Sequence, residues 1–273
     1  MIESILLATD GSDGAHVAER YAAALAGRLK VRLNGLTVIE EGLFQALRAD
    51  ALGVTPPNLD SVEVFFKARA EAVARRVSDH ARSLGVECVP ETARGVADDR
   101  IVERGQGADL IVVGRDGEHQ GSRTGLVGST ADAVLRKTTK PTIVVPRGGE
   151  FGGPLVLGFD GSPGSRIAAK LAVELAGRFE QTIHVFVDSK DKGRAAARFE
   201  EVRRLLGTSS IAVRENSSTL GRPDVKIVDT ARAARAGLIV MGAFGRNRIS
   251  DYFLGSNAAA VVRTSPVAVL LAR

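Results

Sequence analysis

Short apolar runs rich in Val, Ile and Leu alternate with longer amphipathic stretches along the whole chain. The short runs carry little polar alternation, which is typical of strands buried on both faces, whereas the longer stretches place apolar residues at helical spacing. This pattern predicts an α/β fold of doubly wound units, in which helices cover both faces of a parallel sheet. In the first part of the chain we expect strands near residues 3–9, 31–39, 86–92, 109–113 and 142–146.

The clearest helix is predicted over residues 62–84. Gly85 follows it directly and is a typical helix terminator, because glycine adopts positive φ without strain. One side of this helix should pack on the sheet, and the residues on that side are Val62, Phe65, Phe66, Ala70, Val73 and Val77.

The second part of the chain repeats the first. LLATDGS at residues 6–12 returns as VLGFDGS at 156–162, and ADLIVVG at 108–114 returns as AGLIVMG at 236–242. The first motif is displaced by 150 residues and the second by 128. The first copy therefore carries about twenty extra residues, which we assign to a surface excursion at 41–60 with its Pro-Pro break.

Glycines and prolines gather between the copies, where the chain has the sequence PRGGEFGGP at residues 146–154. Such a segment without periodicity is typical of a linker. We therefore predict one domain at residues 1–147, a linker at 148–153 and a second domain at 154–273. A length of 273 residues suits two domains of modest size.

The composition indicates the cellular location of the protein and the classes of partner that it can bind. The net charge is +5, but the basic residues are scattered among acidic ones, which favours solvated helix faces over a nucleic-acid surface. Aromatic residues make up 4% of the chain, so few are present to stack on bases. A single cysteine, Cys88, an acidic N-terminus and the lack of long apolar runs predict a cytoplasmic protein without a membrane segment.

The loop after the predicted fourth strand is the first candidate site, since ligands of open parallel sheets bind beyond the carboxyl ends of the strands. In the second copy the loop carries Gly242, Gly245 and Gly255, and Ser256 follows the last of them. Glycine lets a phosphate approach the backbone, and a helix starting at this point offers N–H donors. The loop is therefore a candidate anion site.

Other residues of this loop fit the same hypothesis and its alternative. Arg246 or Arg248 would supply a counter-charge to a phosphate. Ser256, and Ser129 in the first copy, could instead be ordinary helix N-caps, with the glycines only turning the chain. Recurrence of the arrangement after the same strand in both copies favours a shared design.

An Asp-Gly-Ser sequence ends the first strand of each copy and places Asp10 and Asp160 opposite the glycine loops. A carboxylate at this position can accept hydrogen bonds from a ribose or a base. An Asp-Gly turn leading into a helix cap explains the residue types equally well.

Together these motifs resemble the universal stress protein family. The Asp-Gly-Ser, the G-x2-G-x9-G-S spacing and the closing apolar run at residues 266–271 carry the resemblance, which covers nearly the whole chain in a tandem form. The resemblance implies a five-stranded parallel sheet per domain in the order 3-2-1-4-5. It also implies ATP binding, with or without magnesium, and pairing through the last strand, within this chain and between chains in a homodimer.

Residue roles follow from the resemblance position by position. Asp160 would contact the nucleoside and Phe186 would lie against the adenine. The residues implied at the phosphates are Gly242, Gly245, Arg246, Gly255, Ser256 and Asn257. The matching positions in the first copy are Asp10, Val38, Gly114, Gly117, Gly128, Ser129 and Thr130.

The first copy departs from the family pattern. Ten residues separate Gly117 from Gly128 instead of nine, and Asp116 and Glu118 place negative charge near a phosphate unless Arg115 or Arg123 compensates. We therefore predict tighter nucleotide binding in the second copy.

Enzyme signatures are missing: the chain has no G-x4-G-K-[ST], G-x-G-x-x-G, G-x-S-x-G or H-E-x-x-H. His119 alone among the histidines falls in a candidate loop, and the repeat gives it no counterpart. No catalytic or metal-binding residue is assigned. Three hypotheses remain: an ATP-binding regulatory protein of the stress response, a nucleotide-independent scaffold that docks an unidentified protein, and a slow ATPase.

Overall fold

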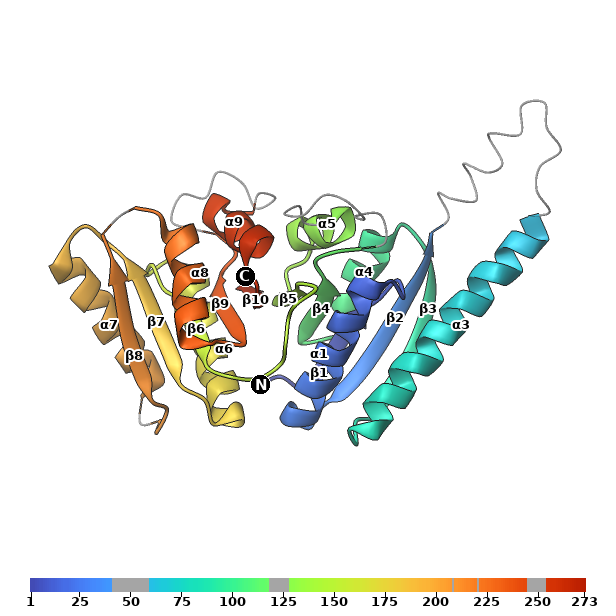
Figure 1. Ribbon diagram of the computed structural model, residues 1–273, viewed down its shortest axis with the longest axis horizontal. Coiled ribbons are helices and arrows are strands. Elements are labelled where there is room, and N and C mark those ends of the chain that lie inside the picture. Colours follow the sequence, from blue (N-terminus) through green and yellow to red (C-terminus); the bar gives the residue numbers. More distant parts are fainter. Residues whose placement is uncertain (41–58, 118–127, 208, 220, 245–253) are drawn as a thin grey trace, which may run out of the picture.

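The computed structural model describes residues 1–40, 59–117, 128–207, 209–219, 221–244 and 254–273 (Figure 1). In the first half the strands are β1 (Ser4–Ala8), β2 (Arg32–Glu40), β3 (Cys88–Gly95), β4 (Leu110–Gly114) and β5 (Thr142–Val145). The helices of this half are α1 (Asp13–Leu29), α3 (Leu59–Ser83), α4 (Ala97–Gly105) and α5 (Ser129–Lys137).

The second half has the same order of elements. Its strands are β6 (Leu155–Gly158), β7 (Ile183–Asp188), β8 (Val213–Ser218), β9 (Leu238–Gly242) and β10 (Ala268–Ala272). Its helices are α6 (Pro163–Phe179), α7 (Lys192–Leu206), α8 (Pro223–Ala234) and α9 (Ser256–Thr264).

All ten strands form one sheet in the order β3-β2-β1-β4-β5-β10-β9-β6-β7-β8. Within each half the strands are parallel, and their order is the predicted 3-2-1-4-5, so the α/β prediction is confirmed. The halves meet at β5 and β10, which pair antiparallel with Ile143 opposite Leu270 (Figure 1).

Each face of the sheet has one apolar core that runs through both halves. Strand residues such as Leu7 and Leu157 pack with α1, α3, α6 and α7 on one face. Leu6 and Val156, the neighbouring positions, pack with α4, α5, α8 and α9 on the other. Side chains of a strand alternate between faces, so apolar residues at every position are required for a sheet covered on both sides.

Arginines and a phenylalanine bind the halves together beside the sheet. Arg28 donates to the carbonyl of Phe179 at 3.0 Å, and Arg178 donates to the carbonyls of Ile2, at 3.0 Å, and Leu29. Each arginine thus reaches the end of the other half's first helix, where carbonyls lack helical partners.

Phe151 of the linker lies between two rings, one from each half. Its ring is edge-to-face with Tyr21 and with Phe179, at a centroid distance of 5.4 Å in both cases. Each such pair is stabilising beyond the area that it buries.

Two local predictions are tested by α3. Gly85 ends the helix as predicted: its φ is +70°, and its N–H donates to the carbonyl of Arg82. The prediction that Phe65 faces the sheet is wrong, because its side chain is 61% exposed. The helix has 25 residues and extends past the strands it covers, so Val73 and Val77 are buried while the first turns are not.

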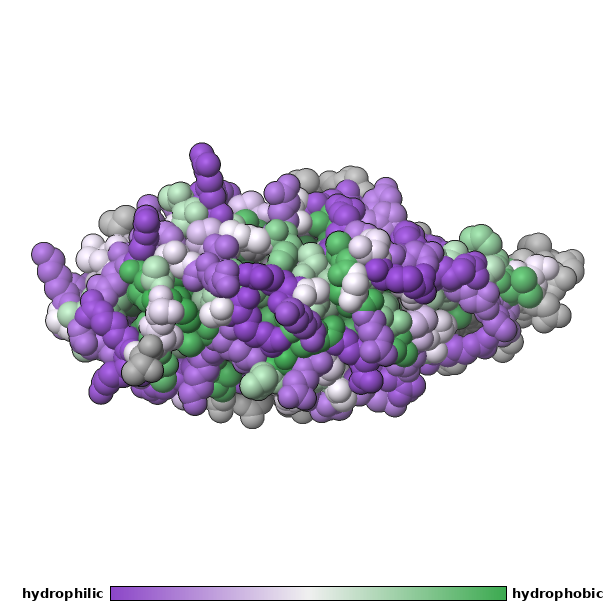
Figure 2. Space-filling view, turned by 90° about the horizontal axis from the view of Figure 1, so that it is seen from below, coloured by the Kyte–Doolittle hydropathy of each residue, from purple (hydrophilic) through white to green (hydrophobic). Residues whose placement is uncertain are grey.

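The other boundaries agree to within a few residues, except that β3 runs to Gly95. Most of the predicted excursion at 41–60 lies outside the described residues. Figure 2 shows hydrophilic side chains spread over both halves on the face it presents, as the scattered charges predict. Among the described residues, no helix has the length and apolar character needed to cross a membrane.

We expect Phe151→Ala to lower the free energy of unfolding by about 2 kcal/mol, because two edge-to-face contacts are lost. Urea denaturation followed by circular dichroism measures the change. Phe151→Leu keeps apolar volume between the halves and should cost less. Equal losses for the two variants, or none for Ala, would show that the ring does not join the halves.

Candidate functional site

Each first strand leads into a tight turn that caps the following helix. Asp160 accepts a hydrogen bond from the N–H of Ser162 at 2.9 Å, and Asp10 accepts one from Ser12 at 3.0 Å. The two serines are the N-caps of α6 and α1. Both aspartates therefore stabilise the Asp-Gly turn, which was one of the two interpretations of the sequence. The turn holds each carboxylate at the carboxyl end of the first strand.

A cleft of 890 Å³ opens at this end of the second half. It lies beyond β6 and β9, where the winding of the sheet reverses. The predicted residues that line it are Asp160, Phe186, Gly242, Gly255, Ser256 and Asn257. Gly245, Arg246 and Arg248 lie outside the described residues.

The start of α9 presents backbone donors to this cleft. Its N-cap is Gly255, which supplies no side-chain acceptor, so the alternative that Ser256 is the cap is wrong. The N–H of Gly255 donates to the carbonyl of Ala243 at 2.9 Å. Within the described part of the chain, the next three N–H groups, from Ser256 to Ala258, have no acceptor. Free N–H donors at the positive end of a helix dipole are features that favour the binding of an anion.

Asp188, at the end of β7, is a lining residue that the sequence analysis missed. Its Oδ1 is buried and has no hydrogen-bond partner among the described residues. The buried Arg198 donates to the Asp188 carbonyl at 3.0 Å and thereby holds the strand end in place. A buried acceptor without a donor is costly, and a ligand hydroxyl placed in the cleft would satisfy it.

Both signs of charge occur around the cleft. The basic side chains are Lys190, Arg194 and Arg198, and the acidic ones are Asp160, Asp188, Asp191 and Asp224. Asp191 caps α7 by accepting from the N–H of Gly193 at 2.8 Å. Most of these residues follow β7 or lie on α7, outside the two loops that the repeat singles out, which is why they were missed.

The first half places Asp10, Gly117 and Gly128 close together in the equivalent position. A Cβ on Gly117 would lie 3.6 Å from Asp10 Oδ2, and a Cβ on Gly128 would lie 3.6 Å from the N of Gly117. Gly114 ends β4, and Ser129 and Thr130 begin α5 after the N-cap Gly128. As in the second half, the serine is not the cap.

The predicted match between Val38 and Phe186 is wrong by two residues. Phe186 pairs with Gly158 on β6, and the equivalent residue of β1, Ala8, pairs with Leu36. Val38 therefore corresponds to Asp188. The polar acceptor that the second half holds at its strand end is replaced by an apolar side chain in the first.

Arg115, a candidate to compensate the negative charge of this loop, pairs with Asp116 and also reaches the other half. It donates to the carbonyls of Ser265, at 2.8 Å, and Arg263, at 3.2 Å, at the end of α9. Its Nε also lies 3.3 Å from a carboxylate oxygen of Asp116, whose other oxygen accepts from the N–H of Arg147 at 3.2 Å. Glu118, His119 and Arg123 lie outside the described residues.

The loop of the first half also lies closer to its helix. A Cβ on Gly14 would be 2.0 Å from the carbonyl oxygen of Asp116. The equivalent distance in the second half, from Gly164 to the carbonyl oxygen of Phe244, is 3.5 Å. The first half therefore has less room at its loop, and the Asp116 carboxylate, paired with Arg115, is held beside it.

Comparison with known proteins agrees with the motifs. The sequence pattern of the universal stress protein family matches residues 1–146 and 153–273. Universal stress protein Slr1230 of Synechocystis sp. is 25% identical over 292 residues, covering 100% of both proteins. A universal stress protein of Mycolicibacterium smegmatis is 27% identical over 230 residues, covering 74% of this chain and 78% of its own.

A solved structure shows the same fold over both halves. The crystal structure of a universal stress protein from Archaeoglobus fulgidus DSM 4304 has a TM-score of 0.77 with 20% sequence identity, covering 99% of this chain and 98% of that one. At 20% identity this similarity supports a shared fold.

The space around Gly242 in the second half can be compared with the space around its counterpart in the first half, Gly114. A Cβ on Gly242 would lie 2.8 Å from backbone C of Gly164, whereas a Cβ on Gly114 would meet its nearest atoms at 3.6 Å. We expect Gly242→Ala to lower the free energy of unfolding by about 2 kcal/mol through overpacking. Gly114→Ala should change it by no more than ~0.5 kcal/mol. Equal effects in thermal denaturation would contradict this difference.

Proposed function

The chain belongs to the universal stress protein family, and we propose that it is a regulatory protein of the stress response whose second half binds ATP. The observation that carries the proposal is the start of α9, where three N–H groups without acceptors among the described residues face the cleft beside Gly242. A phosphate chain would accept from these donors and gain from the helix dipole.

The rest of the nucleotide fits the rest of the cleft. Phe186, Ile227 and Met241 supply an apolar surface for a purine ring at the base of the cleft. The Oδ1 of Asp188 would accept a hydrogen bond from a ribose hydroxyl, which would satisfy this buried oxygen. Asp160, held by its turn, lies at the same strand ends and is the second acceptor for the nucleoside.

Magnesium would enter with the nucleotide. Among the described residues, no group of three or more His, Cys, Asp or Glu side chains is arranged to hold a metal ion. A divalent cation bound to the phosphates would offset the four acidic side chains around the cleft. We propose binding as the activity, with hydrolysis slow if it occurs.

Nucleotide occupancy would act through conformation or through the choice of a protein partner. The first half, with Val38 in place of a polar acceptor and Asp116 beside its loop, is proposed to bind ATP weakly or not at all. The scaffold hypothesis differs in that occupancy of the cleft would be irrelevant to docking.

The test is nucleotide content combined with a thermal shift. We expect protein purified from cells and then denatured to release adenine nucleotide, and ATP with magnesium to raise the melting temperature of stripped protein. Gly255→Glu should abolish the shift, because it places a carboxylate where a phosphate would lie. Gly128→Glu, its counterpart in the first half, should have the smaller effect.

Asp188→Ala provides a second variant that leaves the start of α9 intact. It should weaken ATP binding about tenfold through loss of one charge-assisted hydrogen bond, while circular dichroism shows an unchanged fold. Absence of both bound nucleotide and thermal shift would exclude the ATP proposal and favour the scaffold. A larger effect of Gly128→Glu would assign the nucleotide to the first half.

A further inference from the structure

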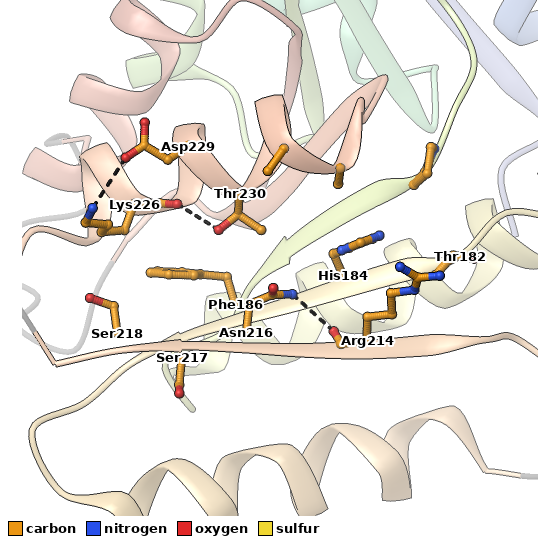
Figure 3. A pocket seen from close by; sticks show the side chains of 13 residues that line it. Thr182, His184, Phe186, Arg214, Asn216, Ser217, Ser218, Lys226, Asp229 and Thr230 are labelled. Carbon is orange, nitrogen blue, oxygen red and sulfur yellow. Dashed lines mark hydrogen bonds and ion pairs between the residues drawn. The ribbon is translucent and has the colours of Figure 1, made fainter.

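A second cavity of 630 Å³ lies away from the loops, between α8 and strands β7 and β8; we call it the α8 groove (Figure 3). His184 and Arg214, which are paired across the two strands, point into it toward the helix. Asn216 and Phe186, the next pair on this face, continue the lining along the strands. The volume is within the range of about 300–1,000 Å³ for small-molecule sites.

Two polar groups of the α8 groove have no partner among the described residues. Neither the guanidinium of Arg214 nor the imidazole of His184 makes a hydrogen bond or ion pair there. Burial, and then the nearby charge of Arg214, holds the pKa of His184 below its ordinary value. The strand side of the groove therefore presents an unneutralised cation next to an imidazole that an anion would help to protonate.

The helix side of the groove is nearly neutral. Lys226 lies 3.5 Å from Asp229, which also lies 3.6 Å from Arg232. Thr230 donates to the carbonyl of Lys226 at 2.8 Å. Ala233 and Ala234 complete this wall with apolar surface. The positive charge that is not balanced within the groove is thus that of Arg214, which lies next to an imidazole whose lowered pKa favours the neutral form.

The first half shows that the fold does not require these polar residues. At the position of Arg214 it has Val89, and at that of Phe186 it has Leu36. Glu91, at the position of Asn216, forms an ion pair with Arg104 of α4. The same layer of helix on sheet is therefore stable with apolar side chains and an ion pair satisfied within the chain.

We propose that the α8 groove binds a small organic anion that carries a ring. The anionic group would lie between Arg214 and His184, and the ring would lie along the groove toward Phe186. Arginine suits carboxylate and phosphate equally, since both accept two parallel N–H donors. Phe186 lines both cavities, so the groove and the ATP cleft share one wall but use different polar groups.

Phenyl phosphate is the probe, and NMR of ring-labelled histidines is the readout. We expect a saturable shift of the His184 resonance and a rise in the pKa of His184 as the dianion stabilises the imidazolium. Benzyl alcohol, which has the ring without the charge, should not cause the rise in pKa. Inorganic phosphate, which has the charge without the ring, should bind more weakly.

Arg214→Gln should weaken binding of phenyl phosphate about tenfold or more. Arg204→Gln, which removes an exposed arginine of α7 outside both cavities, is the matched control and should have no effect. His184→Asn introduces the residue that the first half has at this position, Asn34, and should weaken binding while preserving the fold.

Three results would overturn the proposal. They are the absence of a saturable shift, equal loss of affinity in Arg214→Gln and Arg204→Gln, and loss of phenyl phosphate binding in Gly255→Glu, whose substitution lies in the other cleft. The last result would place the probe in the ATP cleft. Because the experiment needs no bound nucleotide, its outcome is independent of the proposal for the second half's cleft.

Discussion

The antiparallel pairing of β5 with β10 is the interaction on which the rest of the structure depends. It makes one sheet of ten strands from two sheets of five, and it removes one exposed edge from each. Because β5 and β10 are antiparallel, the strands of the two halves run in opposite directions, and their carboxyl ends lie at opposite ends of the strands of the combined sheet. The two candidate sites are therefore separated, while both apolar cores continue across the junction.

The same pairing places each half's helix ends beside the other half's strand ends. Arg115, directly after β4, donates to the carbonyls at the end of α9, whose opposite end lines the cleft of the second half. In the reciprocal contact, Arg273, after β10, donates to the carbonyl of Leu135 at the end of α5 and lies over the ring of Phe244. The arginines satisfy helix carbonyls and also bring each site's surroundings into contact with the other half.

Repetition in the sequence predicted most of the fold. Two ordered copies of strand and helix patterns predicted the strands, the helices and the position of the strand-end loops, because these depend on local periodicity. The strand order 3-2-1-4-5 was implied by the resemblance to the universal stress protein family and is the one observed. The exposure of Phe65 was not predictable, because it depends on how far α3 extends beyond the strands that it covers.

The candidate site was predictable only where its residues belong to repeated motifs. Asp160, Gly242 and Gly255 were found in this way. Asp188 was missed, and Val38 was matched incorrectly, because aligning short strands by residue type does not fix their register. Arg115 pairs with Asp116, which is the compensation that the sequence suggested. Its additional contacts with Arg263 and Ser265 were not predictable, because a contact between residues so distant in sequence leaves no local signal.

The two halves therefore share a scaffold and differ in the groups that surround their candidate sites. The second has room, free helix donors and a buried acceptor, whereas the first has a fixed carboxylate and a loop close to its helix. Isothermal titration calorimetry of the nucleotide-free protein with ATP and magnesium tests this asymmetry most directly. We expect one tight site per chain, whereas two equivalent sites, or none, would show that the halves do not differ in this way.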